Sequence, residues 1–281
     1  MLIAQITDTH IGYGDRARVN ADRLAQVVAA VAAHDASLVV VTGDLTDCGN
    51  VDAYRLFKRL LEPLAGRLLL LLGNHDKRDA FISVFEDVAP AAGYIHTAHT
   101  HSEVRVVTLD TLDEGRETAA FCKTRAAWLE TCLRDQPDTP TLIALHHPPV
   151  RTGVEWIDVN ADGRWSKRLE QVVSRHAQVI GLMAGHAHQP IATVFAGRPL
   201  IIAPSVAFAV AHDTRPLSSN TPDGRALIVD SRPGYALHRW TGERLVSWFG
   251  TVDDAPVVIR FNRDNQAMIA DRFTRGVAHD I

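Results

Sequence analysis

The chain has 281 residues, of which 46% are hydrophobic and 22% charged, typical values for a soluble globular protein with a substantial core. Its net charge of −4 gives no basic surface for nucleic acid or an acidic membrane, and no segment is long enough to span a bilayer. Three cysteines are too few for a disulfide framework, so we expect a reducing compartment and a cytoplasmic protein.

Strands and helices alternate in the first two thirds of the chain. Continuous apolar runs predict strands that are buried on both faces, and apolar residues at helical spacing predict the helices between them. The first helix is expected to begin at Asn20, acting as its N-cap. In chain order the predicted elements are strand Leu2–Thr7, helix Asn20–His34, strand Ser37–Thr42, helix Val51–Leu64, strand Arg67–Leu72, a short helix near Asp79–Glu86, strand Glu103–Asp110, helix Lys123–Asp135, strand Thr141–Leu145, helix Arg164–Ala177 and strand Gln178–Ala184.

The last third of the chain has short strands broken by Gly and Pro. A loop rich in Ser, Thr, Pro and Asn, Asp213–Gly224, either borders the functional site or is a plain connector. We expect a catalytic domain over residues 1–250, in which 204–250 completes the second sheet or supports oligomerisation, and a C-terminal extension over 251–281. The predicted strands are Ile191–Phe195, Pro199–Ala203, Arg225–Asp230, Tyr235–Trp240, Leu245–Phe249 and Pro256–Phe261.

Five short polar phrases each follow a predicted strand. Because strand ends converge at one edge of an α/β sheet, residues far apart in the sequence are expected to meet there. Their carboxylate, imidazole and amide groups suit borderline transition metals, and seven such ligands are too many for one ion. The sequence therefore predicts two metal ions. The phrases are Asp8-Thr-His10, Gly43-Asp44, Gly73-Asn74-His75-Asp76, His146-His147 and Gly185-His186-Ala187-His188.

The spacing within these phrases suggests how the ligands are shared. If the chain is still extended after the first strand, Asp8 and His10 point the same way and can bind one ion. His186 and His188 have the same spacing, but a turn opened by Gly185 can divide them between two ions. Asp44 has two carboxylate oxygens and can bridge two metals. Each phrase alone also occurs as a helix cap or turn, and only the ordered set favours a metal site.

In this order, the phrases resemble those of the calcineurin-like metallophosphoesterases, and in detail those of the bacterial class III cyclic-nucleotide phosphodiesterases and related glycerophosphodiesterases. The resemblance covers about Leu2 to Ala203. It implies a four-layer α/β/β/α sandwich of two mixed β-sheets flanked by helices. It also implies two metal ions, whether Mn, Fe, Zn or Co, with Asp44 as their bridge. One ion would be bound by Asp8, His10, Asp44 and His188, and the other by Asp44, Asn74, His146 and His186.

Two ions roughly 3.5–4 Å apart can clamp the attacking and leaving oxygens of a phosphate ester and supply a hydroxide near neutral pH. Asp44 and Asn74 would act in catalysis as ligands. His75 is expected to bind a phosphoryl oxygen or protonate the leaving alkoxide, or alternatively to orient Asn74 or the bridging water.

We therefore expect a dinuclear metal-dependent phosphodiesterase that attacks small phosphodiesters with a metal-bridging hydroxide, with 3′,5′-cyclic AMP as the first substrate guess. A glycerophosphodiesterase, or a broad phosphodiesterase with phosphomonoesterase activity, is the nearest alternative. A non-catalytic scaffold on the same fold is a remote one, because such proteins usually lack some of the ligands. The resemblance also implies a homodimer or higher homo-oligomer. We expect no nucleic-acid partner and no membrane insertion.

Overall fold

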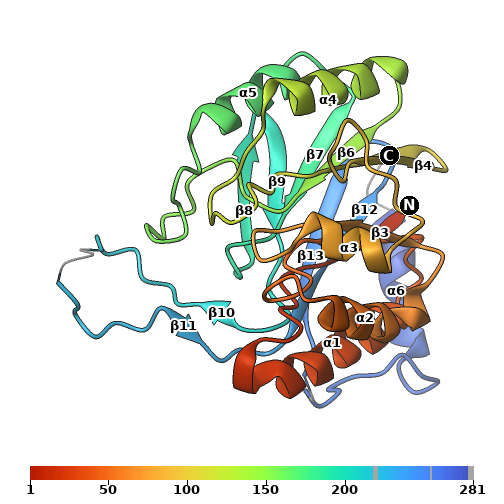
Figure 1. Cartoon of the computed structure of the whole chain (residues 1–281). Helices are drawn as coiled ribbons and strands as arrows, with labels where there is room; N and C mark the ends of the chain where they lie inside the picture. The colour runs from red at the N-terminus through yellow and green to blue at the C-terminus, as the bar shows by residue number, and fades with distance from the viewer. Residues whose placement is uncertain (218–220, 254, 278–281) are drawn as a thin grey trace.

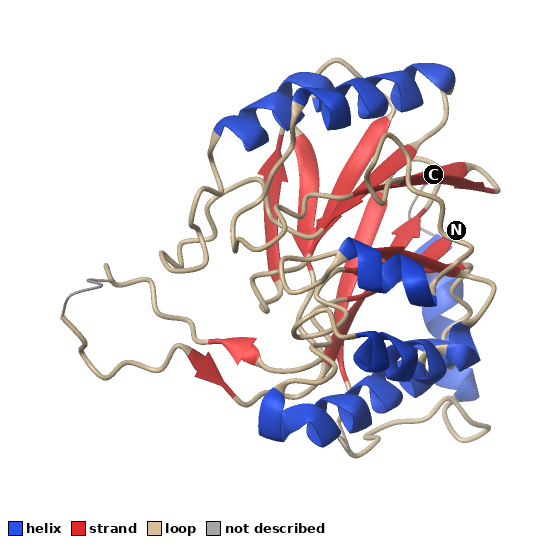
Figure 2. Ribbon diagram, viewed as in Figure 1, coloured by secondary structure: helices blue, strands red, loops and turns tan. Residues whose placement is uncertain are grey.

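The computed structural model describes residues 1–217, 221–253 and 255–277. Two β-sheets lie face to face between two layers of helices (Figures 1 and 2). This arrangement confirms the predicted four-layer α/β/β/α sandwich of two mixed sheets. No helix in the described ranges is long and apolar enough to cross a membrane.

The first sheet has the strand order β13-β12-β1-β2-β3. Its three N-terminal strands are parallel to one another, whereas β12 is antiparallel to β1 and to β13. Of the late strands, β12 and β13 thus belong to the sheet of the N-terminal strands, and the alternative that residues 204–250 support oligomerisation stays a prediction. The backbone of β12 pairs with the open edge of β1, whose polar groups would otherwise lack partners. The strands are β1 (Leu2–Ile6), β2 (Leu38–Thr42), β3 (Leu68–Leu71), β12 (Gly234–Trp240) and β13 (Leu245–Thr251).

The second sheet has the order β4-β5-β6-β7-β9-β8. Its four central strands are parallel, and its two edge strands are antiparallel to their neighbours. The parallel central strands carry their carboxyl ends to the same edge of the sheet, which is where the predicted ligands follow. The strands are β4 (Thr97–His101), β5 (Val104–Leu109), β6 (Thr141–Leu145), β7 (Val179–Ala184), β8 (Ile191–Phe195) and β9 (Arg198–Ile202).

Three apolar layers hold the sandwich together. One lies between the first sheet and its helices, one between the second sheet and its helices, and a third between the two sheets, around Val40, Val106 and Met183. Burial on both faces explains why the strands read as continuous apolar runs. The helices beside the first sheet are η1 (Gly14–Arg16), α1 (Ala17–Ala32), α2 (Val51–Leu60), η2 (Glu62–Leu64) and α3 (Arg78–Val84). Those beside the second sheet are α4 (Lys123–Asp135) and α5 (Arg164–Val173). Near the C-terminus lies α6 (Gln266–Val277).

Two local expectations are wrong. Asn20 is not the N-cap of α1, because the helix begins at Ala17, and the buried Asn20 side chain instead donates to the carbonyl oxygen of His10 over 3.0 Å. No strand forms over Pro256–Phe261, whose apolar side chains are exposed, so this segment lacks the burial that its apolar run predicted. The sequence also failed to indicate α6.

A two-stranded ribbon projects from the sandwich beside the metal-ligand edge (Figure 1). It pairs β10 (Ala209–Val210) with β11 (Ile228–Val229), so only two residues of the predicted strand Arg225–Asp230 are extended and paired. The division between a domain over 1–250 and an extension over 251–281 stays a prediction, and residues 278–281 of that extension lie outside the described residues.

A buried polar network joins the two sheets beneath the ligand edge. The Gln5 side-chain amide donates to the carbonyl oxygen of Ala184 over 2.7 Å and to Thr42 Oγ1 over 2.9 Å. Gln5 Oε1 therefore faces His238 Nε2 over 3.0 Å, and this nitrogen must be the donor. The other ring nitrogen, His238 Nδ1, lies 2.8 Å from Ser247 Oγ. The network fixes one neutral tautomer of His238, and burial lowers the pKa of His238 to about 4.

We predict that His238 makes the folding stability pH-dependent. Because its pKa is about 4 in the folded protein against 6.5 for a free side chain, the unfolded chain binds more protons in this window. The stability that neutral His238 contributes to the folded protein is complete above the pKa of the unfolded side chain, 6.5. It is lost as the pH falls towards the folded pKa of about 4. Urea unfolding should be measured at neutral pH and at about pH 5. Between the two, the free energy of unfolding should fall by about 2 kcal/mol more in wild type than in His238→Gln. A control at the exposed His99, His99→Gln, should behave as wild type, and an equal loss in His238→Gln would contradict the assignment.

Candidate metal centre

The predicted ligands lie together just beyond the carboxyl ends of five parallel strands from both sheets. Asp8 follows β1, Asp44 follows β2 and Asn74 follows β3, while His146 and His186 follow β6 and β7. The structure thus brings together all seven predicted ligands in two groups that meet at Asp44.

The first group consists of Asp8, His10, Asp44 and His188, whose ligand atoms all lie within 4.8 Å of one another. His188 Nε2 is 3.3 Å from Asp8 Oδ1 and 3.2 Å from His10 Nε2. His10 Nε2 is in turn 3.6 Å from Asp44 Oδ2. All four residues are buried, so these nitrogens and oxygens converge on one point away from bulk water.

The second group lies on the other side of the same carboxylate oxygen. Asp44 Oδ2 is 3.3 Å from His146 Nε2, and Asn74 Oδ1 is 3.1 Å from that nitrogen. Asn74 Oδ1 is also 3.0 Å from His186 Nδ1. Asp44 Oδ2 therefore faces both groups, which is the position that a bridging ligand requires.

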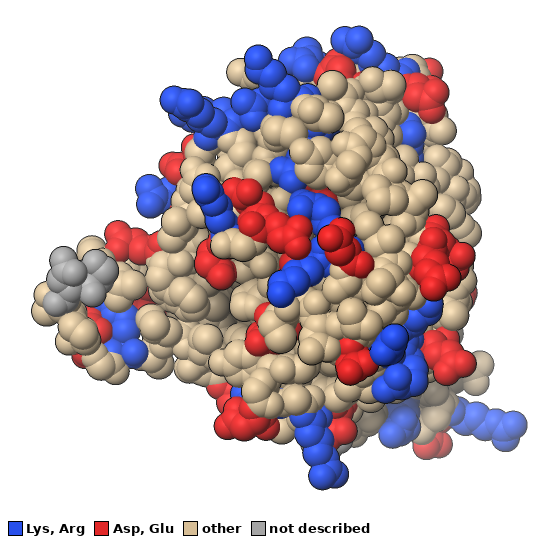
Figure 3. Space-filling view, in the orientation of Figure 1, with Lys and Arg blue, Asp and Glu red and all other residues tan. Residues whose placement is uncertain are grey.

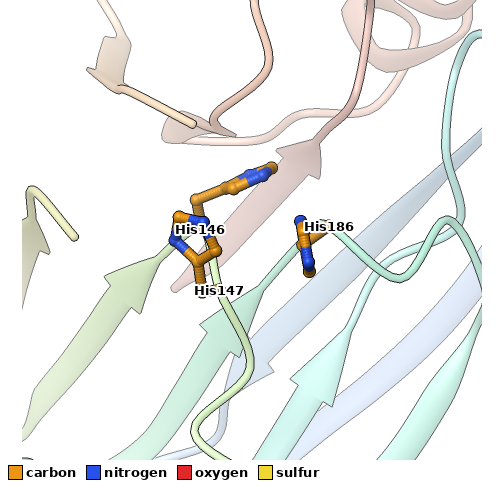
Figure 4. A group of neighbouring side chains, drawn as sticks. All are labelled: His146, His147 and His186. Atoms are coloured by element: carbon orange, nitrogen blue, oxygen red, sulfur yellow. The ribbon is translucent and has the colours of Figure 1, made fainter. Parts of the chain in front are cut away.

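His147 also lies close to the second group. The imidazoles of His146, His147 and His186 stand beyond the ends of β6 and β7 (Figure 4), and their nitrogens can approach within 4.8 Å of one another. His147 Nδ1 is 2.8 Å from Thr111 Oγ1, and its buried Nε2 has no hydrogen-bond partner among the described residues. His147 therefore lies beside His146 and His186, and its Nδ1 is occupied by Thr111.

Five of the seven predicted ligands have a left-handed backbone conformation, with φ between 42° and 68°. The expectation that Asp8 and His10 sit on extended chain is therefore wrong. Such a conformation is unfavourable for a residue with a Cβ, and clusters of it mark functional sites. Hydrogen bonds hold the chain there, such as those from the amides of Asp8 and His10 to the carbonyls of Gly43 and Asp44. The five residues are Asp8, His10, Asp44, His186 and His188.

Two glycines make room for the bridge. Gly43 has φ of +88°, and a Cβ there would collide with the His146 ring and the Gly73 backbone. A Cβ on Gly73 would overlap the Asp44 carboxylate. Both positions require glycine because the loops after β2, β3 and β6 approach within van der Waals contact.

The imidazole rings are oriented by hydrogen bonds from their second nitrogens. His146 Nδ1 lies 2.8 Å from the carbonyl oxygen of Thr42, and His188 Nδ1 lies 2.9 Å from that of Phe208. His10 Nδ1 is 3.2 Å from Asp47 Oδ1. Because a carbonyl or carboxylate oxygen can only accept, each Nδ1 donates and each Nε2 lone pair is directed into the site. This is the usual outer support of metal-ligating histidines.

The buried charges compensate one another in the absence of metal. Burial would raise the pKa of Asp44, but the neighbouring imidazoles of His146 and His10 outweigh it and hold that pKa well below its usual value. Burial opposes protonation of His146, but Asp44 prevails and raises the pKa of His146 to about 9. A cation that binds here must displace this proton, so metal affinity should increase with pH. The donor set of imidazole, carboxylate and amide oxygen fits Mn, Fe, Co or Zn.

His75 lies at the mouth of this site and is not one of the converging ligands. Its backbone amide donates to Asp44 Oδ1 over 3.0 Å, and its Nδ1 donates to the carbonyl oxygen of Asp47 over 2.8 Å. Burial disfavours the charged ring, but the carboxylates of Asp44, Glu117 and Asp47 outweigh it and raise the pKa of His75. Its Nε2 lies 4.0 Å from Glu117 Oε2, and His75 lines the cavity, where a proton could be donated.

A cavity of about 250 Å³ opens over the two groups. Ligands and His75 form its floor, and its walls are largely apolar or aromatic. The sequence did not indicate eight of the lining residues, because they carry no motif and come from separate segments. Three of them are aliphatic, namely Ile157, Val210 and Ile228, and the other five are polar or aromatic. These are Tyr13, Asp47, Glu117, Trp156 and Phe208. Only Asp47 had a detectable signal, as a carboxylate three residues after Asp44.

The calcineurin-like phosphoesterase profile matches residues 1–190 of this chain. The chain belongs to the calcineurin-like phosphoesterase family. It is 35% identical to a probable cyclic nucleotide phosphodiesterase of Rhodopseudomonas palustris, covering 76% of this chain and 81% of that protein. It is 29% identical to a probable glycerophosphodiester phosphodiesterase of Arcobacter nitrofigilis, covering 87% and 90%.

The fold also resembles that of a dimetal phosphatase from Danio rerio. The TM-score is 0.61 at 16% sequence identity, and the match covers 89% of this chain and 95% of that one. Family membership confirms the resemblance predicted from the sequence. Together with the relatives named phosphodiesterases, it supports the predicted class, a metal-dependent phosphoric diester hydrolase. The family uses a dinuclear metal centre, and the two side-chain groups described above are suited to bind one.

We predict that Asp44→Asn abolishes metal bridging. The amide nitrogen would face the imidazole nitrogens of His10 and His146, and the bridging charge would be lost. We expect fewer than two metal ions per chain by elemental analysis, and hydrolysis at least about 10³-fold slower, equivalent to about 4 kcal/mol. The exposed carboxylate Asp52 on α2 offers a matched control, and Asp52→Asn should keep both metals. Full activity in Asp44→Asn would rule out this mechanism.

Proposed function

We propose that this enzyme is a dinuclear metal-dependent phosphodiesterase that hydrolyses small phosphodiesters, with 3′,5′-cyclic AMP as the first candidate substrate. The observation that carries the proposal is the position of Asp44 Oδ2, which lies 3.6 Å from His10 Nε2 and 3.3 Å from His146 Nε2. One carboxylate oxygen between two groups of potential metal ligands is suited to join two cations. The proposed ligands remain those predicted from the sequence, namely Asp8, His10, Asp44, Asn74, His146, His186 and His188.

When bound, two divalent ions would supply Lewis acidity towards the phosphate and a water of lowered pKa. The chain's own residues hold and orient the reacting groups. Asp44, Asn74 and the histidines would hold the two ions, which in turn would bind the phosphate. His75 Nδ1 is bonded to the Asp47 carbonyl, so Nε2 is the nitrogen that would hold a proton for the leaving alkoxide.

The cavity supports a small substrate with an apolar or planar part. Besides the polar floor, the side chains of Tyr13, Trp156 and Phe208 line it, together with Ile157, Val210 and Ile228. A nucleobase can be enclosed by such walls, whereas glycerol makes less use of them. Acidic and basic side chains lie interspersed on the molecular face in Figure 3, so the attraction for a phosphate is expected to come from the bound cations.

Two alternatives remain. A glycerophosphodiesterase is favoured by the relative from Arcobacter nitrofigilis, whose match covers more of this chain. A scaffold without activity is disfavoured by the convergence of every predicted ligand. A cytoplasmic location and a homodimer or higher homo-oligomer also remain proposals, as do the absence of nucleic-acid partners and of membrane insertion.

We predict a strong preference for diesters. Metal-stripped enzyme reloaded with Mn²⁺ should hydrolyse bis(p-nitrophenyl) phosphate at least about tenfold more efficiently than p-nitrophenyl phosphate, because the proposed site carries only a small net positive charge to balance a monoester dianion. Initial rates on the two substrates measure this directly, and cyclic AMP and a glycerophosphodiester should be compared next. Preference for the monoester would instead indicate a phosphatase.

We predict that His75→Ala slows cleavage of cyclic AMP by about 10²–10⁴-fold in kcat. The effect on bis(p-nitrophenyl) phosphate should be much smaller, because p-nitrophenolate leaves without being protonated. Metal content is the control, because it should remain at the wild-type value if His75 acts as an acid. A loss of metal together with equal slowing of both substrates would show instead that His75 only orients Asn74 or the site water.

A further inference from the structure

We propose that Glu117 is a positioning residue that holds the Asn74 side chain with its oxygen towards the second metal position. Nothing in the sequence marks Glu117, which lies in the loop between β5 and α4. In the structure its Oε2 accepts a hydrogen bond of 2.6 Å from Asn74 Nδ2 at the rim of the cavity. The inference rests on the proposed function, because it concerns binding of the second ion by that site.

The chemistry of the partners determines the orientation of the amide. A carboxylate can only accept, so the amide group that faces Glu117 must be the nitrogen. The oxygen is then directed inward, 3.1 Å from His146 Nε2 and 3.0 Å from His186 Nδ1. A flipped amide would present an NH₂ group to the cation position and would contribute no ligand. Because the acceptor is ionised, the bond is about twice as strong as a neutral one.

The loop that carries Glu117 is firmly attached, although Glu117 itself is exposed. Arg78 forms a bidentate pair with the buried Asp110, with distances of 2.7 and 2.8 Å, and also donates to the carbonyl oxygen of Leu112. Arg125 donates to the carbonyl oxygens of Leu112 and Ala120. The Glu117 side chain is 77% exposed. Replacing it therefore removes the carboxylate without opening the core.

Asn74 needs this help more than the other ligands. The imidazoles of His146 and His188 are oriented by buried backbone carbonyls, and Asp8 accepts two bonds from the backbone amide of His186. Asn74 is half-buried, and Glu117 is the partner of its amide nitrogen within the described residues. Loss of an outer partner of a ligand typically weakens metal binding by about 10–100-fold.

The test is a calorimetric titration of metal-stripped protein with Mn²⁺, accompanied by electron paramagnetic resonance to distinguish isolated ions from a coupled pair. In Glu117→Ala we expect the second ion to bind about 10–100-fold more weakly, with the first ion unaffected. In Glu117→Gln the side-chain carbonyl can accept the same hydrogen bond, so most of the affinity should return. Glu114→Ala is the matched control, because Glu114 belongs to the same loop but pairs with Arg78.

Three outcomes would overturn the proposal. The second ion could bind Glu117→Ala as tightly as wild type. Glu117→Ala and Glu114→Ala could weaken it equally, which would indicate a general effect of loop charge. Glu117→Gln could be as weak as Glu117→Ala, which would implicate charge and not the hydrogen bond. A wild type that binds two ions yet hydrolyses no phosphodiester would instead refute the proposed function and leave the role of Glu117 intact.

Discussion

The whole site depends on burying the Asp44 carboxylate between imidazoles. Asp44 is 1% exposed, and an uncompensated charge at such a place would cost several kcal/mol. The Asp44 charge raises the pKa of His146 to about 9, whereas burial and the neighbouring His146 charge lower the pKa of His186 to about 4. The site is therefore built for a net positive occupant, and protons and metal cations compete for it.

This arrangement requires unfavourable backbone conformations at several of the proposed ligands. Five ligands adopt left-handed conformations, each at a cost of about 1–3 kcal/mol, and they persist because the surrounding loops leave no alternative. The Asp76 carboxylate accepts from the backbone amides of Leu45, Thr46 and Gly73 and so ties the loop after β2 to the loop after β3. The structure thus uses a buried acceptor next to the site to keep Asp44 in its place.

The fold, and the convergence of the proposed ligands at one edge, were predictable from the sequence because both depend on local patterns. Apolar runs revealed the strands, and polar phrases after them revealed Asp8, Asp44 and His186. Features set by tertiary contacts were not predictable. The left-handed turns, the pairing of β12 with β1 and the role of Asn20 all depend on neighbours distant in sequence. Glu117 was missed for the same reason, because its partner Asn74 is 43 positions away.

The centre has a buried, hydrogen-bonded floor and a more exposed rim. Below the ligands, Gln5 links the first sheet to the Ala184 carbonyl at the end of β7, so the strands that deliver Asp8 and His186 are fixed to each other. Above them, Asn74, His75 and Glu117 are half-buried or exposed and come from loops. The rim is tied to this floor, because Asn74 Oδ1 lies 3.1 Å from His146 Nε2 and the His75 amide donates to Asp44 Oδ1 over 3.0 Å. A change of substrate preference is therefore expected at the apolar cavity wall, where Trp156 and Phe208 line the site without serving as proposed ligands.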